Sequence, residues 1–334
     1  MSFVDQSARS VGLLAVRSLP HRVKAALYSV RARVLGRGLS RSRIFEGSVD
    51  CRAASGSMSI IVPIHDAPLV TRRCLASLER DATKSEIILV DDGSKLAETT
   101  ELVQKSSSRN GWKVVRSEEP RGHSAACAAG ARFATRPYLC LLNSDTVVTP
   151  WCWRAIQEVF DTDSSIGVAG PCTSSSGNEQ TLDLASKCCL YWNDSQICAF
   201  AERLTVAPLQ PVIFDLPWIS GFALFIRSGL WKTLGGFDQN LKNYLNDVEL
   251  CKRVTNLGYR TVWVRSAYIH HLGNQSHPKI LSAAEVQSAL LPYLQYIRNK
   301  HRWEPRVNAG YTTIVRSRDG KTWAIRSDQR AASV

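Results

Sequence analysis

The sequence contains no Cys-x-x-Cys pair, although it has ten cysteines among its 334 residues. Cys188 and Cys189 are adjacent, and the other cysteines are scattered along the chain. This spacing is typical neither of a zinc site nor of a disulfide-rich secreted scaffold. We therefore expect reduced thiols, many of them buried, in a cytoplasmic protein.

The sequence also lacks any apolar run that approaches the roughly 20 residues needed to cross a membrane, and no signal peptide is evident. It has neither the glycine spacing of a Rossmann dinucleotide site nor the lysine of a Walker loop. These absences argue against a membrane-spanning protein and against a dinucleotide- or ATP-dependent enzyme. A hydrophobic content of 44% supports a packed core, and the length fits one large α/β domain with additions or two smaller domains.

Acidic residues are nearly absent from the first 43 residues, where Asp5 stands alone against nine arginines and lysines. This stretch therefore carries a net charge of +8, out of +13 for the whole chain. Pro20 precedes apolar residues at helical spacing, which predicts a basic amphipathic helix that lies on an anionic membrane surface. These apolar residues are Val23, Leu27, Val30 and Val34. The alternatives are a solvated arm or a helix that packs on the domain, and no nucleic-acid partner is expected because no nucleic-acid motif follows.

Strand and helix patterns alternate after a small, polar linker at residues 47–57. This βαβ repetition predicts an α/β fold with a doubly wound, mostly parallel central sheet and helices on both faces. The predicted strands are Ser59–Ile64, Glu86–Val90, Lys113–Arg116, Tyr138–Leu142, Ile166–Ala169, Trp218–Arg227 and Tyr259–Val264. The predicted helices are Leu69–Arg80, Leu96–Lys105, His123–Ala134, Trp151–Phe160, Asp247–Leu257 and residues 283–300.

We expect three parts in the chain: a basic arm with its linker (1–57), an α/β domain (58–277) and a C-terminal extension (278–334). Residues 171–217 interrupt the alternation, and a loop of this length often serves as a lid or binds the acceptor. In the extension, two short β patterns flank Asp319-Gly320, which predicts a hairpin of residues 312–316 and 322–326.

Carboxylates follow two of the predicted buried strands. Asp91 and Asp92 come at the end of the second strand, and Asn143 and Asp145 directly follow the fourth. Open α/β sheets bind ligands at the carboxyl ends of their strands, and an Asn-x-Asp pair supplies oxygen ligands that suit a hard divalent cation. From the residues alone, the alternatives are a helix cap for the first pair and a polar turn for the second.

Two further groups of residues offer binding chemistry. Gly122 and His123 begin an alanine-rich helix, whose N-terminus is a candidate site for phosphate or sugar. His270 and His271 cannot both face one side of a strand. We therefore expect one of them at a metal or a diphosphate, and the other in a structural role.

Asp247 opens the helix predicted over residues 247–257. A carboxylate at a helix start is usually a cap, but one presented into a cleft beside a nucleotide can deprotonate a hydroxyl group. Glu249 and Arg253 follow at i and i+4, a spacing that predicts an ion pair along the helix.

Taken in this order, the clusters resemble the family 2 glycosyltransferases of bacteria, particularly the rhamnosyltransferase-like members, over roughly residues 58–277. The resemblance is carried by Ile60-Ile61-Val62-Pro63, Val90-Asp91-Asp92-Gly93-Ser94, Leu142-Asn143-Ser144-Asp145-Thr146, Gly235-Gly236-Phe237-Asp238, Asn246-Asp247-Val248-Glu249-Leu250-Cys251, and His271 with Ser276. It implies a GT-A fold and a nucleotide-activated sugar as the donor. It does not identify the sugar.

The resemblance also implies roles for individual residues. Pro63, Asp91 and Asp92 would face the nucleotide; Asn143, Asp145 and His271 would lie at Mg²⁺ or Mn²⁺ on the diphosphate; and Asp247 would be the catalytic base of an inverting transfer. The implied partners are a nucleotide-diphosphate sugar and an acceptor hydroxyl of a cell-surface polysaccharide or a lipid-linked saccharide, at the inner face of the cytoplasmic membrane. Asn246 stands where the family usually has Glu, and the alternative is a sugar-nucleotide-binding homologue without turnover.

Overall fold

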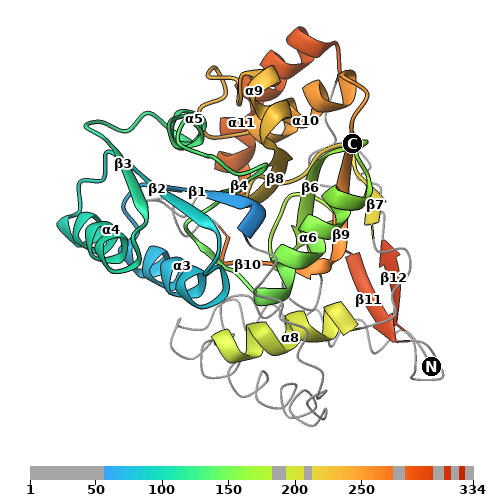
Figure 1. Cartoon of the computed structure of the whole chain (residues 1–334). Helices are drawn as coiled ribbons and strands as arrows, with labels where there is room; N and C mark the ends of the chain where they lie inside the picture. Colours follow the sequence, from blue (N-terminus) through green and yellow to red (C-terminus); the bar gives the residue numbers. More distant parts are fainter. Residues whose placement is uncertain are drawn as a thin grey trace, which may run out of the picture.

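A computed structural model describes residues 56–182, 193–206, 213–273, 283–303, 312–316 and 323–327. An eight-stranded sheet with the order β3-β2-β1-β4-β8-β6-β9-β7 runs through the centre of this structure (Figure 1). Its strands are β1 (Met58–Ile64), β2 (Glu86–Asp92), β3 (Lys113–Ser117), β4 (Tyr138–Leu142), β6 (Ile166–Cys172), β7 (Ile213–Asp215), β8 (Ala223–Arg227) and β9 (Arg260–Tyr268). Only β8 and β7 run against the common direction of the other strands. The predicted α/β fold with a mostly parallel sheet is therefore confirmed.

Helices cover both faces of the sheet. Successive strand residues point to opposite sides, and apolar residues on both sides are buried under helices. Ile61 of β1 belongs to a core that includes Cys127 of α5, whereas its neighbours Ile60 and Val62 belong to a second core with Leu75 of α3. The helices are α3 (Pro68–Asp81), α4 (Ala97–Asn110), α5 (His123–Ala131), α6 (Pro150–Thr162), α8 (Asp194–Val206), α9 (Ser228–Leu234), α10 (Asn246–Asn256) and α11 (Ala283–His301). The prediction of helices on both faces is confirmed.

Helix α5 lies unusually close to the sheet. A Cβ atom at Gly130 would lie 2.5 Å from Ile61 Cγ2 and 2.8 Å from Val90 Cγ2, so only glycine fits there. This close packing holds the first residues of α5 beside the carboxyl end of β2, where the predicted ligand site lies.

Two sequence predictions need correction in the region after β6. The strand predicted from Trp218 begins only at Ala223, and residues 218–222 form a loop. Their apolar pattern resembles a strand, but the N–H of Ser220 donates to Gln180 Oε1 (2.8 Å) instead of to a strand neighbour. Residues 171–217, which the sequence analysis treated as a long loop, contain helix α8 and strand β7, together with a bridge between Thr173 and Thr181.

Helix α11 of the C-terminal extension packs on residues 58–277. Ile297 of α11 is fully buried in the same core as α5 and α10, so this helix shares the core of residues 58–277. The predicted hairpin is present as β11 (Thr312–Arg316) and β12 (Trp323–Ser327). Among the described residues no helix has the length and hydropathy of a membrane span, and the amphipathic helix expected before residue 43 lies outside them.

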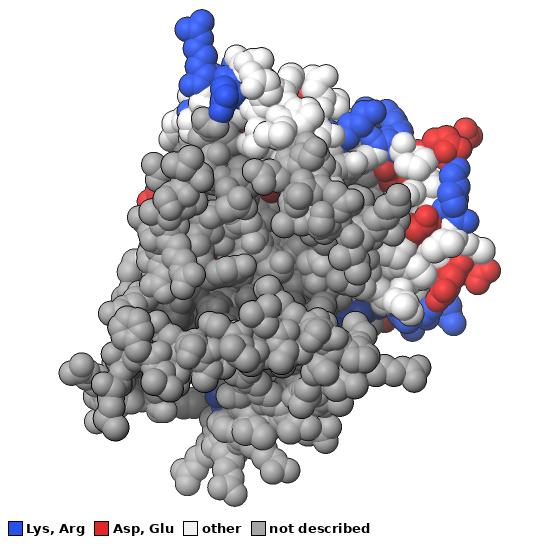
Figure 2. Space-filling view, turned by 180° about the vertical axis from the view of Figure 1, so that it is seen from behind, with Lys and Arg blue, Asp and Glu red and all other residues white. Residues whose placement is uncertain are grey.

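Charged side chains of both signs lie next to each other on the side of the molecule that carries α3 and α4 (Figure 2). Ion pairs there join Arg72 to Glu98 at 3.0 Å and Lys95 to Glu119 at 2.8 Å. The positive charge of the chain is therefore not concentrated on this side.

Candidate active site

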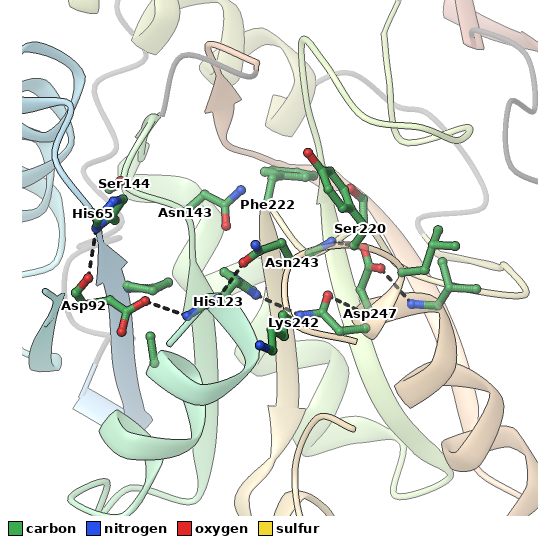
Figure 3. A pocket seen from close by; sticks show the side chains of 18 of the residues that line it. His65, Asp92, His123, Asn143, Ser144, Ser220, Phe222, Lys242, Asn243 and Asp247 are labelled. Atoms are coloured by element: carbon green, nitrogen blue, oxygen red, sulfur yellow. Dashed lines mark hydrogen bonds between the residues drawn. The ribbon is translucent and has the colours of Figure 1, made fainter. Parts of the chain in front are cut away.

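A cavity of about 640 Å³ opens at the carboxyl ends of β1, β2 and β4. Five of the predicted site residues line it, namely Pro63, Asp92, Asn143, Asp247 and His271. Figure 3 shows Asp92 and Asp247 on opposite sides of the cavity, with Asn143 and His123 between them. Residues more than 180 positions apart in the sequence thus meet at one place.

Asp92 shapes one wall of this cavity. Its carboxylate accepts the backbone N–H of Arg121 (3.0 Å) and of Gly122 (2.8 Å), and its carbonyl oxygen is 2.9 Å from His65 Nδ1. Gly122 has a φ of +92°, which favours glycine. Asp92 therefore fixes the loop before α5 while its side chain borders the cavity.

The start of α5 has little donor capacity left for a ligand. The N–H of His123 donates to Asn243 Oδ1 (3.0 Å), and the N–H of Ser124 donates to the carbonyl of Lys242 (2.9 Å). Because Gly122 N–H is also engaged, these backbone groups join α5 to the loop before α10. The structure gives no support to the predicted phosphate site at this helix start.

Asp91 points away from the cavity. It is buried, accepts the N–H of Ser94 (2.9 Å) and forms an ion pair with Arg116. Neither Asp91 nor Asp92 caps α4, whose N-cap residue Leu96 has no side-chain cap. Its contacts make Asp91 a residue that joins β2 to β3.

Asp145 contacts His271, which lines the cavity, from the side away from it. The short strands β5 (Thr146–Val147) and β10 (His270–His271) pair antiparallel, which brings His271 Nε2 to 3.2 Å from Asp145 Oδ1. His271 Nδ1 donates to the carbonyl of Ser175 (2.7 Å), so Nε2 is the nitrogen that faces Asp145. Burial alone would lower the pKa of His271, but the negative charge of Asp145 outweighs it and raises that pKa.

The second histidine has a different environment. His270 is fully buried and its Nδ1 lies 2.7 Å from the hydroxyl of Tyr268. Its ring faces the core, as expected for adjacent residues of a strand.

The donor set at Asp145 fits a cation held jointly with a substrate. Among the described residues, no group of three or more His, Cys, Asp or Glu side chains could hold a metal. Mg²⁺ and related hard ions usually take one or two carboxylates, with waters and substrate phosphates completing the shell. Asp145, His271 and the amide oxygen of Asn143 suit such a site, and His271 has the backbone partner on its other nitrogen that metal-binding histidines usually have.

Asp247 borders the cavity on the side of α10. Its Oδ2 accepts the N–H of Gly221 (2.6 Å), its Oδ1 accepts the N–H of Val248 (2.8 Å), and a Cβ at Gly221 would lie 3.2 Å from Oδ2. The N-cap position belongs to Leu245, at a φ of 58° that is costly for leucine. Burial raises the pKa of Asp247 above the ordinary value of 3.8, although the N–H groups of Gly221 and Val248 oppose this shift. A raised pKa makes this carboxylate a stronger base.

The sequence did not single out several cavity residues. His123, His65 and Trp218 line it, yet Trp218 was expected to begin a strand, and at His123 only the helix start, not the imidazole, was expected to bind a ligand. Burial lowers the pKa of His123 to about 4, although Asn143, Asp92 and Asp145 favour its charged form. His123 is therefore neutral near pH 7. In the local sequence, only Gly122, directly before His123, indicated that this position lies at a binding site.

Comparison with known sequences gives a family match over slightly more than half of the chain. The model of glycosyl transferase family 2 matches residues 59–231. An N-acetylglucosaminyl-diphospho-decaprenol L-rhamnosyltransferase of Mycobacterium tuberculosis is 35% identical over 63 residues, which are 19% of this chain. The match spans only 20% of that relative.

Solved structures show the same fold at low identity. A mannosyltransferase from Pyrobaculum calidifontis, in complex with GDP-Man and Mn²⁺, has a TM-score of 0.51 at 16% identity, over 88% of this chain and 76% of its own. GalNAc-T7, solved with UDP, GalNAc and Mn²⁺, has a TM-score of 0.51 at 18% identity, over 64% of this chain and 43% of its own. The chain thus has the GT-A fold that the motifs implied.

Proposed function

Because the chain belongs to glycosyl transferase family 2, we propose that it transfers a sugar from a nucleotide diphosphate to an acceptor hydroxyl, with inversion at the anomeric carbon. The observation that carries this proposal is the single cavity that Asp92, Asn143, His271 and Asp247 line. Nucleotide-binding and base residues of such an enzyme must act on one donor–acceptor pair, and a shared cavity meets this requirement.

Asp247 acts as the general base in this proposal. Its carboxylate removes the proton of the acceptor hydroxyl while that oxygen attacks the anomeric carbon from the face opposite the leaving diphosphate. Asp247 is held by two backbone N–H groups, so the side chain has little freedom to turn away from the cavity. Asp92 and Pro63, on the far side of the cavity, face the nucleotide.

Asp145, His271 and Asn143 would hold a divalent cation on the diphosphate. When bound, such an ion neutralises negative charge that develops on the leaving group. Both Mg²⁺ and Mn²⁺ suit these ligands.

The donor is identified by a thermal-shift screen of UDP-, GDP- and dTDP-sugars with Mn²⁺, since a ligand that binds the folded state raises the melting temperature. We expect one nucleotide class to stabilise the protein and Asp145→Asn to lose the part of that shift that depends on Mn²⁺. Asp161→Asn, on the far end of α6, is the matched control. An Mn²⁺-dependent shift of wild-type size in Asp145→Asn would contradict the metal assignment.

An assay of nucleotide diphosphate release distinguishes an active enzyme from a homologue that binds the sugar nucleotide without turnover. We expect the sugar nucleotide found in the screen to be turned over when a saccharide acceptor is added. Tight binding without any turnover, over a panel of lipid-linked and free saccharides, would favour the homologue without activity.

The basic segment 1–43 suggests where the acceptor is found. Its net charge of +8 favours contact with anionic lipid at about 1 kcal/mol per basic residue near the surface, and the rhamnosyltransferase relative acts on a decaprenol-linked acceptor by name. We therefore propose a lipid-linked saccharide as the acceptor. Deleting residues 1–43 should release the protein from phosphatidylglycerol vesicles at low salt in a sedimentation assay, and unchanged partitioning would refute the membrane role.

A further inference from the structure

The side chain of Asn246 is a buried junction between α5 and α10. It is 3% exposed, its Oδ1 accepts the N–H of Asp247 (2.9 Å), and its Nδ2 lies 2.8 Å from Ser124 Oγ and 3.0 Å from His123 Nδ1. Both ends of the amide are therefore engaged at the first turn of α10. The next residue along the chain is the proposed base.

The direction of each hydrogen bond follows from the protons that are present. Ser124 Oγ gives its only proton to the carbonyl of Leu241 (2.5 Å), so it accepts from Asn246 Nδ2. An amide NH₂ group donates and never accepts, so His123 Nδ1 must also accept. His123 is therefore a neutral imidazole with its proton on Nε2. A carboxylate at position 246 would have no proton to give to either partner.

We propose that Asn246 and His123 form a positioning pair whose neutral amide–imidazole hydrogen bond fixes the start of α10 and aims the Asp247 carboxylate into the cavity. The backbone there needs such a hold, because Leu245 adopts a φ of 58° immediately before Asn246. His123 lies between Asp92 and Asp247 in Figure 3. Asp92 accepts the N–H groups of Arg121 and Gly122, directly before His123. The pair therefore links the position of Asp247 to that of Asp92, on the nucleotide side of the cavity. This inference rests on the proposed role of Asp247 as base, and it makes Asn246 a matched partner of His123 instead of a sign of lost activity.

The first test measures the pair without any turnover. Imidazole ¹⁵N spectra of the full chain at pH 7 should show the His123 proton on Nε2. Hydrogen exchange at the Asp247 amide should be about five- to tenfold faster in His123→Phe, which keeps the ring contact with Phe237 but has no acceptor. His123→Gln, which restores an acceptor oxygen, should recover part of the protection.

The second test measures the effect on catalysis. With the sugar nucleotide from the screen, Asn246→Asp and His123→Phe should each lower kcat about 100-fold, because a small misplacement of a reacting group has effects of this size. The KM for the donor, and the affinity for the corresponding nucleoside diphosphate with Mn²⁺, should stay near the wild-type values. Asn110→Asp, an exposed residue at the end of α4, is the matched control and should leave kcat unchanged.

The two tests fail separately. A proton on His123 Nδ1 in the wild type, or wild-type exchange at Asp247 in His123→Phe, overturns the positioning pair even if the enzyme transfers sugar. If no sugar nucleotide is turned over, the proposed function fails, and the exchange and ¹⁵N results still decide whether the pair holds Asp247. If the variants lose kcat only together with a lower melting temperature, and His123→Gln restores neither, the pair has only a structural role and the proposal is also overturned.

Discussion

Asp247→Asn should lower the rate of sugar transfer by about 10²- to 10⁴-fold, the usual contribution of a general base. The substitution keeps the shape of the side chain, and its amide oxygen can still accept the N–H of Gly221. We therefore expect the affinity for the nucleotide donor to change little, so that the loss appears in kcat. Single-turnover measurements at saturating donor and acceptor would record it.

The pH profile gives this prediction a second readout. Only the ionised carboxylate can accept a proton, so the rate should fall as the pH drops through the pKa of Asp247. Because burial raises that pKa, the acid limb of the wild-type profile should lie above 3.8. The residual rate of Asp247→Asn should have no such limb.

Loss of folding cannot explain the expected result. A buried carboxyl with a raised pKa makes its ionised form unfavourable in the folded state, and this cost is present at pH values above that pKa. Asp247→Asn removes this cost but also loses one of the two bonds from backbone N–H groups, so its melting temperature at pH 7 should stay close to the wild-type value. Asp215→Asn, an exposed residue of β7 that pairs with Arg260, is the matched control. Full turnover by Asp247→Asn would show that another group is the base.

The strand-end motifs were predictable because they are local. An apolar run followed at once by polar residues marks the end of a buried strand, and the parallel order β2-β1-β4 then brings Asp92, Pro63 and Asn143 to one edge. The meeting of His271 with Asp145 depends on the antiparallel pair β5–β10, which joins segments more than 120 residues apart. Only the family resemblance could suggest that contact.

Other features depend on partners that the local sequence does not reveal. Asp91 and Asp92 are equivalent in the sequence, but alternate side chains of a strand face opposite ways, and Arg116 on the neighbouring strand pairs with Asp91 alone. His123 acquires its role from Asn246, which is 123 positions away. Helix α8 had a usable signal, since Ile197, Phe200, Ala201 and Leu204 recur at helical spacing and all are buried. The irregular sequence around it concealed this pattern.

Glu249→Ala should destabilise the fold by about 3–5 kcal/mol, the usual cost of breaking a buried ion pair by removing one partner. Glu249 is fully buried in α10. Its carboxylate accepts from Arg253 Nε (2.9 Å), Lys300 Nζ (2.7 Å) and His301 Nε2 (3.0 Å). The ion pair that the sequence predicted between Glu249 and Arg253 is thus part of a larger cluster that ties α11 to α10. Urea denaturation at pH 7 would measure the loss of unfolding free energy.

The size of the effect follows from what the variant leaves behind. Arg253 also donates to the carbonyls of Leu234 and Gly236, at 2.7 Å each, so its charge would stay in place without its carboxylate. Lys300 would keep Asp238, at 2.6 Å. Glu98→Ala is the matched control, because its ion pair with Arg72 is exposed and such pairs contribute about 0–1 kcal/mol.

The pH dependence of stability tests the same cluster. Burial alone would raise the pKa of Glu249, but the hydrogen bonds from Arg253 and Lys300 outweigh it and lower that pKa below 4.5. A carboxyl whose pKa is lower in the folded state contributes its stability above the unfolded pKa and loses it as the pH falls through the folded value. The unfolding free energies of wild type and Glu249→Ala should therefore differ most near pH 7 and converge below pH 4.5. A constant difference over this range would mean that the lost packing volume, and not the carboxylate charge, determines how firmly α11 holds α10 and, with it, Asp247.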